Sequence, residues 1–305
     1  MKFNTTKSGI KFSALGLGAM NLPIDATDSQ YILDQAVDLG VTYIDTADLY
    51  QKGQNEKNIG HFIKQSKKRD QITLASKVGN RFNMLNDEVV WDPSKEHIKQ
   101  SIHESLKRLE TDYLDLYMLH GGMIEDNKDE TIETFEALKK EGLIRAYGIS
   151  SIRPNVIDYY LRNSNIDTIM MQFNLIDNRP ANLVEMIQEK DVQILARGPL
   201  MKGLLTDKAL TVLDKKFETG TLGLSYDELK DSLTKASQIA PLQHAVYQYL
   251  MTQPVASIVN GASNVDQLQA NVEAFETMLD HPIDAQDLEK ITQAFKNIQY
   301  EDHLI

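Results

Sequence analysis

The sequence predicts an α/β fold in which eight strands, alternating with helices, close into a single (β/α)8 barrel, the TIM-barrel architecture. Short β-prone runs alternate with amphipathic helical segments along the whole chain. This alternation predicts parallel strands joined by right-handed crossovers. No linker or shift in composition divides the chain, so residues 1–305 are expected to form one domain. A doubly wound sheet is the alternative, but eight strands in a chain of 305 residues favour the barrel.

The elements can be assigned in order. An N-terminal β-hairpin is expected over the first twelve residues, with Lys7-Ser8-Gly9 at its turn. Ser29 is expected to cap the first helix, and Asp92, before Pro93, to mark the start of the third. The expected barrel strands are 13–20, 41–45, 71–79, 111–122, 143–151, 166–174, 191–200 and 255–263. The expected helices are 29–40, 55–65, 92–110, 129–142, 155–163, 179–190, 241–253 and 264–275, with mixed loop and helix over 204–240 and an extra C-terminal helix at 284–298.

Composition excludes several classes of function. The formal net charge of −12 argues against nucleic acid or an anionic membrane surface as a partner. The absence of cysteine excludes disulfides, thiolate catalysis and cysteine metal sites. His97 and His103 do not share a helical face, and no metal site is predicted. No run approaches the ~18 apolar residues of a membrane span, and the N-terminus lacks an apolar signal region, so a cytoplasmic protein is expected.

Polar side chains stand at the ends of the predicted strands. In barrel enzymes the active site lies at the C-terminal ends of the strands. Each residue alone has a structural explanation, since an acid can cap a turn and a histidine can be buried and satisfied. An acid, a lysine and a histidine at the ends of three consecutive strands favour a site instead. The residues at the predicted strand ends are Asp45, Lys77, His120, Ser150, Ser151, Gln172, Arg197 and Asn260.

These residue types suggest acid–base chemistry on a carbonyl group. Lys77 follows an apolar run, so Asp45 on the neighbouring strand is its expected partner. An ammonium group beside Tyr50 should lower the phenol pKa from its usual value of about 10, which would make Tyr50 a general acid. His120 could donate a hydrogen bond to the carbonyl oxygen. Such a site has no nucleophile of its own and needs a reductant, which implies a nicotinamide cofactor.

The segment from Asp45 to Gly60 resembles the signature of the aldo-keto reductase family. It reads Asp45-Thr46-Ala47-x-x-Tyr50-Gln51-x-Gly53-x-Asn55-Glu56-x-x-x-Gly60, against D-T-A-x-x-Y-G-x-G-x-S-E-x-x-x-G in the family. The "SK" lysine matches Lys77 and the "LH" histidine matches His120. The resemblance runs from about residue 3 to 275. It implies a catalytic tetrad of Asp45, Tyr50, Lys77 and His120, and reduction of aldehydes or ketones with NADP(H) as cofactor.

The resemblance also implies where the cofactor binds. Ser150, Ser151 and Gln172 match the positions that hold the carboxamide. "GPLMKGLL" resembles the segment along the pyrophosphate, and "NGASNVDQLQAN" the adenosine end. The residues expected to contact the cofactor are Gly18, Ala19, Met20, Ser150, Ser151, Gln172, Arg197, Gly198, Pro199, Leu200, Gly203, Lys208, Gly261, Ser263, Gln267 and Asn271.

Some positions depart from the family pattern. Gln51 and Asn55 replace a common glycine and serine, and both should be tolerated in a loop. No basic residue lies between Ala262 and Asn271, so NAD(H) is not excluded. Arg197 stands where relatives place a tyrosine or tryptophan on the nicotinamide. Its side chain is expected either to turn outward, with Phe173 or a loop covering the ring, or to lie along the nicotinamide or its phosphates.

Two other functions remain open from the sequence. A barrel lyase could use Lys77 to form a Schiff base with a carbonyl substrate, although Tyr50 would then have no obvious role. A cofactor-binding regulatory subunit with slow turnover would keep the same site. The expected partner is a small carbonyl or alcohol substrate. The sequence leaves its identity and the oligomeric state undefined.

Overall fold

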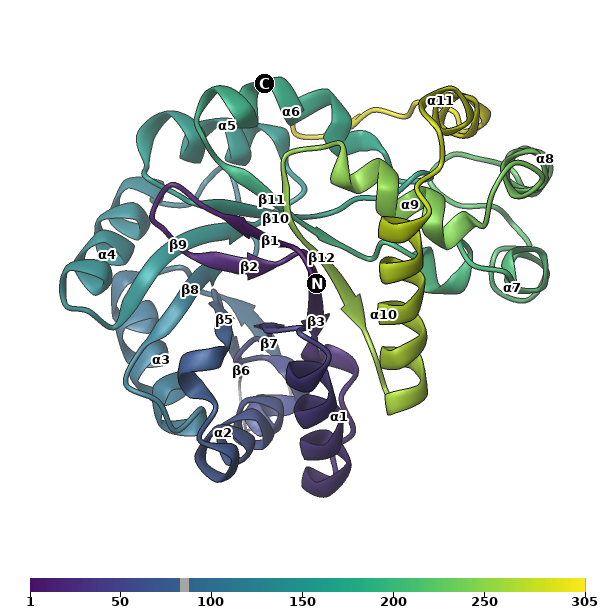
Figure 1. Cartoon of the computed structure of the whole chain (residues 1–305). Helices are drawn as coiled ribbons and strands as arrows, with labels where there is room; N and C mark the ends of the chain where they lie inside the picture. Colours follow the sequence, from purple (N-terminus) through teal and green to yellow (C-terminus); the bar gives the residue numbers. More distant parts are fainter. Residues whose placement is uncertain (83–87, 305) are drawn as a thin grey trace.

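The computed structural model describes residues 1–82 and 88–304 and contains a closed barrel of eight parallel strands (Figure 1). Sequence neighbours pair around the barrel, and the last strand closes on the first. The predicted (β/α)8 architecture is therefore confirmed. The barrel strands are β3 (Leu15–Gly18), β4 (Tyr43–Asp45), β5 (Thr73–Val78), β8 (Leu114–Leu119), β9 (Ile144–Ser150), β10 (Thr168–Gln172), β11 (Gln193–Arg197) and β12 (Val255–Gly261).

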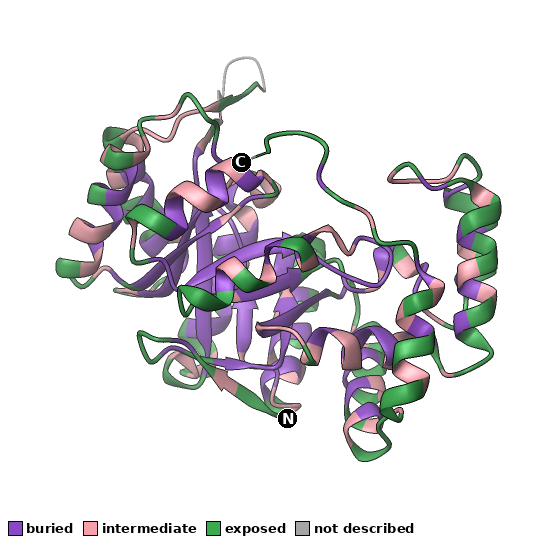
Figure 2. Ribbon diagram, turned by 90° about the horizontal axis from the view of Figure 1, so that it is seen from above, coloured by how far each residue is buried: buried purple, intermediate pink, exposed green. Residues whose placement is uncertain are grey.

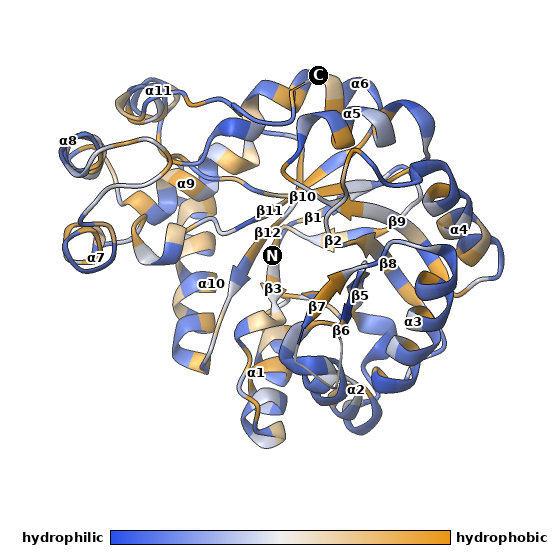
Figure 3. Ribbon diagram, turned by 180° about the vertical axis from the view of Figure 1, so that it is seen from behind, coloured by the Kyte–Doolittle hydropathy of each residue, from blue (hydrophilic) through white to orange (hydrophobic). Residues whose placement is uncertain are grey.

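Helices surround the barrel, and their ribbons carry both hydrophobic and hydrophilic residues (Figure 3). The segment 204–240, for which the sequence predicted mixed loop and helix, holds α7 and α8. None of the helices in the described part of the chain is both long and apolar enough to span a bilayer. The helices are α1 (Ala26–Asp38), α2 (Gln54–Ser66), α3 (Lys95–Arg108), α4 (Lys128–Lys140), α5 (Pro154–Asn163), α6 (Val184–Glu189), α7 (Ala209–Lys216), α8 (Tyr226–Ser237), α9 (Leu242–Met251), α10 (Val265–Asp280) and α11 (Ala285–Ala294).

The N-terminal hairpin is confirmed as β1 (Phe3–Thr5) paired antiparallel with β2 (Lys11–Ser13). Its turn is anchored to the barrel by the buried carboxylate of Asp167, which precedes β10. The Thr6 hydroxyl donates to Asp167 at 2.6 Å and the Ser8 hydroxyl at 2.7 Å. Phe12 packs edge-on against Tyr43 inside the barrel, with ring centroids 4.7 Å apart. The hairpin therefore closes the end of the barrel opposite the strand C-termini.

The core has two layers separated by the strands (Figure 2). Side chains alternate across each strand, so Leu116 and Met118 of β8 fill the barrel interior while Tyr117 faces the helices. The Tyr117 ring meets Phe135 of α4 at a centroid distance of 5.6 Å. The same alternation places Lys77 on the inner side of β5 while Ser76 faces outward to Glu56.

Two local expectations need correction, and one pair of strands was not predicted. Ser29 lies inside α1, which begins three residues earlier because Asp25 accepts hydrogen bonds from two first-turn N–H groups. The cap of α3 is Ser94 rather than Asp92, since the Ser94 hydroxyl accepts from the backbone N–H of His97. The sequence reasoning also missed a rim hairpin of β6 (Asn80–Phe82) and β7 (Val89–Trp91), which pair antiparallel.

Candidate active site

Three of the four predicted tetrad residues lie at the ends of adjacent strands. Asp45 is the last residue of β4, Lys77 the penultimate residue of β5, and His120 directly follows β8. The strands are in parallel register, with Asp45 opposite Ala75 and Lys77 opposite Met118. Tyr50 begins the short 3-10 helix η2 (Tyr50–Gly53) in the loop after β4. All four side chains therefore reach the same edge of the barrel.

Lys77 and Asp45 form a buried ion pair. The Lys77 side chain is 0% exposed, and its Nζ lies 2.7 Å from Asp45 Oδ2. The ammonium also donates to the Thr46 carbonyl oxygen at 2.8 Å and to the Tyr50 hydroxyl oxygen at 3.3 Å. Burial lowers the pKa of Lys77, but the negative charge of Asp45 and the phenol of Tyr50 raise it more, so the net pKa is raised and the lysine stays charged. The same burial raises the pKa of Asp45, against the charge of Lys77.

The expected lowering of the Tyr50 pKa is wrong for this structure. Lys77 does act in the predicted direction, but burial raises the phenol pKa more strongly, and the charge of Asp45 adds to it. The net pKa of Tyr50 therefore lies above its ordinary value. A phenol with this pKa is fully protonated at neutral pH, so Tyr50 can act as a proton donor and Lys77 can stabilise the phenolate that donation leaves.

His120 is a neutral imidazole. Burial, and then the positive charges of Lys77 and Arg197, lower its pKa to about 3. Its ring meets that of Tyr50 edge-on, with centroids 5.9 Å apart and an interplanar angle of 82°. The Nδ1 atom is buried and has no hydrogen-bond partner among the described residues. A neutral imidazole carries one N–H, so it can donate one hydrogen bond to an oxygen placed beside Tyr50.

Asn55 helps to hold the loop that carries Tyr50. Its side chain is fully buried, accepts from the Thr46 hydroxyl at 2.6 Å and donates to the Ala19 carbonyl oxygen at 2.7 Å. Gln51 adopts a left-handed backbone at φ 49° and donates to the Leu22 carbonyl oxygen at 2.7 Å. The two departures from the family pattern thus link the loop that carries Tyr50 to the turn after β3.

The residues predicted to hold a cofactor are placed by the fold at the same edge. Ser150, Gln172, Arg197 and Gly261 are the last residues of β9, β10, β11 and β12. Gly18 ends β3, with Ala19 and Met20 in the following turn, and Ser151 follows β9. Gly198, Pro199, Leu200 and Gly203 form the loop after β11, Lys208 precedes α7, and Ser263 and Gln267 flank the start of α10.

Three predicted contact residues, Ser263, Gln267 and Asn271, form hydrogen bonds within the protein. The Ser263 hydroxyl and backbone N–H both donate to the Gln267 side-chain oxygen at 3.0 Å. Asn271 is largely buried in α10 and accepts from the Gln243 amide at 3.1 Å. Asn260, near the end of β12, turns outward and donates to the hydroxyl of Tyr247 on α9 at 2.5 Å.

Arg197 brings a positive charge to the mouth of the barrel. The residue is exposed, and its guanidinium has no hydrogen-bond or ion-pair partner among the described residues. Its charge contributes to lowering the pKa of His120 and opposes the raised pKa of Tyr50. Phe173 is fully buried against Tyr249, with centroids 5.7 Å apart. Phe173 is therefore not available to cover a ring bound at the mouth.

Trp91 at the rim was missed by the sequence reasoning. Its ring packs directly on Gly79 and Gly121. A Cβ atom added at Gly79 would lie 2.6 Å from the indole, and one added at Gly121 would lie 3.1 Å from it. Its Nε1–H donates to Asp126 at 2.9 Å, which ties β7 to the loop after β8. One signal could have found it, since Trp91 is the only tryptophan of the chain and two glycines stand at neighbouring strand ends.

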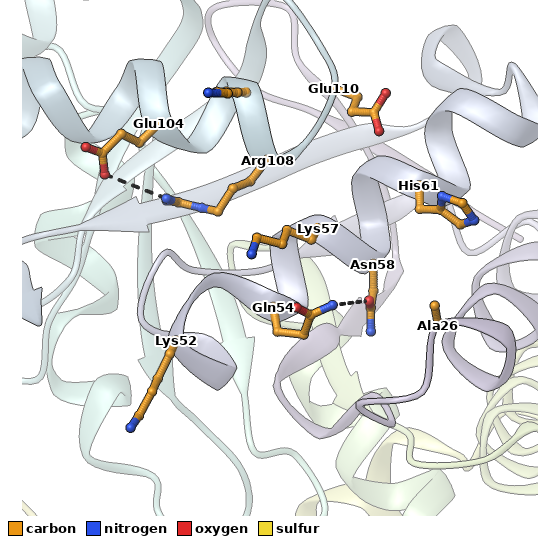
Figure 4. Close-up of a pocket in the computed structure, with 10 residues that line it drawn as sticks. Ala26, Lys52, Gln54, Lys57, Asn58, His61, Glu104, Arg108 and Glu110 are labelled. Atoms are coloured by element: carbon orange, nitrogen blue, oxygen red, sulfur yellow. Dashed lines mark hydrogen bonds and ion pairs between the residues drawn. The ribbon is translucent and has the colours of Figure 1, made fainter. Parts of the chain in front are cut away.

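A separate groove lies outside this edge. It has a volume of about 690 Å³ and runs between α2 and α3 on the outer ring (Figure 4). Lys57, Lys107 and Arg108 line it, together with Glu104 and Glu110. It contains none of the tetrad residues.

The fold brings these side chains together at the strand C-termini of a closed barrel. Residues 14–295 match the sequence model described as Aldo/keto reductase family. The chain therefore belongs to this family of oxidoreductases.

Three relatives illustrate the similarity. The chain is 47% identical to "Uncharacterized oxidoreductase YqkF" of Bacillus subtilis, over 88% of each protein. It is 31% identical to "Aldo-keto reductase yakc [NADP(+)]" of Schizosaccharomyces pombe, over 67% of this chain and 61% of that protein. Among solved structures, it superposes on the holo form of aldo-keto reductase AKR11C1 from Bacillus halodurans with a TM-score of 0.93, 45% identity and 99% coverage of both chains.

We expect Lys77→Met to lower the free energy of unfolding by about 3–5 kcal/mol, because it leaves the buried carboxylate of Asp45 without its partner. Chemical denaturation at neutral pH measures this loss. The matched control is the double variant Lys77→Met, Asp45→Asn, which removes the orphan charge and should recover part of the loss. Equal unfolding free energies for wild type and Lys77→Met would contradict the assigned pair.

Proposed function

We propose that the protein is an NADP(H)-dependent carbonyl reductase that converts aldehydes or ketones to alcohols, with Tyr50 as the general acid. The observation that carries this proposal is the cluster at the barrel mouth. The Tyr50 hydroxyl lies 3.3 Å from a charged Lys77, and its ring lies against a neutral His120. This combination suits protonation of an oxygen atom and offers no nucleophile for attack on a carbon.

The residues at the mouth fit a nicotinamide dinucleotide. Ser150 and Gln172 are partly exposed at neighbouring strand ends and carry the donors and acceptors that a carboxamide needs. Arg197 offers an unpaired guanidinium, and the loop after it contains Gly198 and Gly203 in left-handed conformations at φ 63° and 95°. Glycines in such turns let backbone N–H groups approach phosphate oxygens closely. When bound, the cofactor supplies the hydride that reaches the carbonyl carbon.

The chain's own residues supply the proton and the orientation. His120 donates a hydrogen bond to the carbonyl oxygen and aims it at Tyr50. Tyr50 transfers its hydroxyl proton to that oxygen as negative charge develops there. Lys77 stabilises the resulting phenolate, and Asp45 keeps the ammonium in place. The raised pKa of Tyr50 means that the proton is present on the phenol at neutral pH.

The Schiff-base alternative is disfavoured by the surroundings of Lys77. A Schiff base needs a neutral amine that a substrate can reach. Lys77 is 0% exposed, and its pKa is raised by the neighbouring Asp45 and Tyr50 against the effect of burial. Its three donors already have acceptors in Asp45, Thr46 and Tyr50. A regulatory subunit with slow turnover would keep the same site, so turnover separates it from the reductase.

Titration of the protein with NADPH and NADH, followed by fluorescence, tests the cofactor assignment. NADPH is favoured because Arg197 and Lys208 offer cations to phosphate groups, and the name of the Schizosaccharomyces pombe relative carries NADP(+). A panel of small aldehydes and ketones then tests turnover. Failure to bind either reduced cofactor would overturn the proposal, and cofactor binding without turnover would favour the regulatory subunit.

We expect Tyr50→Phe to lower kcat for carbonyl reduction by roughly 10²–10⁴, the usual contribution of a general acid. Cofactor affinity should stay within about twofold, because the lost hydroxyl faces Lys77 rather than a phosphate. Steady-state kinetics with a cofactor titration measures both quantities. A Tyr50→Phe enzyme with wild-type turnover would contradict the proposed mechanism.

We also expect Arg197→Tyr to change the preference between cofactor redox states. A guanidinium along the nicotinamide stacks more favourably on the neutral reduced ring than on the positively charged oxidised ring. Wild type should therefore bind NADPH more tightly relative to NADP⁺ than the variant does. Dissociation constants for both forms measure the ratio, with Arg197→Lys as the control that keeps the charge and removes the flat face. An unchanged ratio in Arg197→Tyr would show that Arg197 does not contact the ring.

A further inference from the structure

The orientation of His120 depends on its backbone. The backbone N–H of His120 donates to the Val78 carbonyl oxygen at the end of β5, at 2.7 Å, and the His120 carbonyl oxygen accepts from Asn80 Nδ2 at 3.5 Å. The ring meets Tyr50 edge-on, and its Nδ1 atom is buried without a partner among the described residues. No hydrogen bond from Nδ1 to those residues fixes the ring, so the direction of the imidazole follows from how firmly the chain at position 120 is held.

Glycine gives the chain after His120 little stiffness of its own. Gly121 and Gly122 have φ angles of 141° and 115°, in the region that favours glycine. Gly79, which lies two residues after Lys77 at the end of the neighbouring strand, has a φ angle of 133°. Glycines therefore follow both Lys77 and His120 at the barrel mouth, and contacts from other residues must hold the chain there in place.

Trp91 of β7 supplies such a contact to both segments at once. The atoms Cζ3 and Cη2 of its six-membered ring cover Gly79 and Gly121, so closely that a Cβ atom on either glycine would lie 3.1 Å or less from the ring. The backbone N–H of Asp92, the next residue, donates to the Gly79 carbonyl oxygen at 2.8 Å. The missing side chains of the two glycines thus make room for one indole that packs on the chain beyond β5 and beyond β8.

Asp126 holds the indole in this position. Its Oδ1 accepts from Trp91 Nε1–H at 2.9 Å, and its Oδ2 accepts from the backbone N–H of Met123 at 2.6 Å. One carboxylate therefore joins the ring that covers Gly121 to the same loop two residues further on. Arg153, which precedes α5, donates from Nη1 to the Gly122 carbonyl oxygen at 3.0 Å. The loop after His120 is thus held both by the rim hairpin and by the loop after β9.

We propose that Trp91, held by Asp126, is a positioning residue for His120. The indole fixes the chain at Gly121, and this sets the direction in which the imidazole presents its N–H to the carbonyl oxygen. The proposal rests on the proposed reductase function for its kinetic test. Without the indole, Gly121 regains its conformational freedom and the imidazole leaves the productive direction. A misplacement of about 1 Å in an active site can cost about 10²-fold in rate.

The kinetic experiment compares wild type with Trp91→Leu and Asp126→Asn. Trp91→Leu removes the ring from both glycines, and Asp126→Asn keeps the shape but offers one acceptor oxygen in place of two. With NADPH and a carbonyl substrate, kcat should fall about 10- to 10²-fold in Trp91→Leu and less in Asp126→Asn. KM should stay within about twofold in both variants. A rise in KM with an unchanged kcat would assign Trp91 to the wall of the substrate site and overturn the proposal.

A double-mutant cycle separates the positioning of His120 from a general effect on the fold. In a His120→Ala background, Trp91→Leu should change kcat by no more than about twofold, because the side chain that the indole positions is gone. In the wild-type background the same substitution should have its full effect. An equal fall in kcat in both backgrounds would show that Trp91 does not act through His120.

Glu125→Gln is the matched control for Asp126→Asn. Glu125 is the exposed neighbour of Asp126 in the same loop, so its substitution removes the same charge and leaves the hydrogen bond to Trp91 in place. We expect kcat of Glu125→Gln to equal that of wild type. A loss as large as that of Asp126→Asn would assign the effect to the charge of the loop, and the proposed link through the indole would be wrong.

Measurements without turnover separate this proposal from the reductase assignment. The imidazole nitrogens of His120, assigned by the loss of their signals in His120→Ala, should shift in the ¹⁵N NMR spectrum of Asp126→Asn, which keeps the indole and its ring current. Trp91 is the only tryptophan of the chain, so its fluorescence emission reports on the indole directly and should move to longer wavelength in the same variant. Both results are expected even if no substrate is found. Unchanged His120 signals in Asp126→Asn and in Trp91→Leu would reject the proposal.

Discussion

The buried pair of Lys77 and Asp45 is the interaction on which the rest of the site depends. A fully buried ammonium is tolerated only where acceptors surround it, and here three acceptors come from the end of β4 and the loop that follows it. The pair fixes the ends of β4 and β5 against each other and places a positive charge beneath Tyr50. It also helps to keep His120 neutral, because Lys77 adds to the effect of burial. One ion pair thus acts on the pKa of both neighbouring groups, although burial has the larger effect on each.

The barrel makes this pair possible. Closure brings the ends of eight strands to one edge, so residues distant in sequence meet without long loops. The hairpin that Asp167 anchors closes the opposite end, and the Phe12–Tyr43 contact fills the interior below the site. Tyr43 also donates toward Asp45 at 3.4 Å, which gives the carboxylate a second partner from beneath. The packed interior therefore keeps water from the ion pair on the side away from the mouth.

The sequence predicts the barrel and the tetrad because both depend on periodicity and on strand ends. The last residues of β4, β9 and β10 were each named from the sequence. The sign of the Tyr50 pKa could not be predicted, because it depends on how deeply the loop is buried. Trp91 and the β6–β7 hairpin were missed since three-residue strands give little periodic signal. The Glu56–Arg108 ion pair could not be predicted from the sequence for a different reason. The two residues lie 52 positions apart, on two different helices.

β5 separates two charge arrangements. Alternation along the strand points Lys77 toward the barrel mouth and Ser76 outward to Glu56. The inner side therefore holds a cation paired with one carboxylate, while on the outer side Arg108 and the hydroxyls of Ser76 and Ser105 satisfy Glu56. Lys77 and Glu56 are therefore held on opposite sides of β5, each with its own partners, and the inner arrangement is the one that contacts Tyr50.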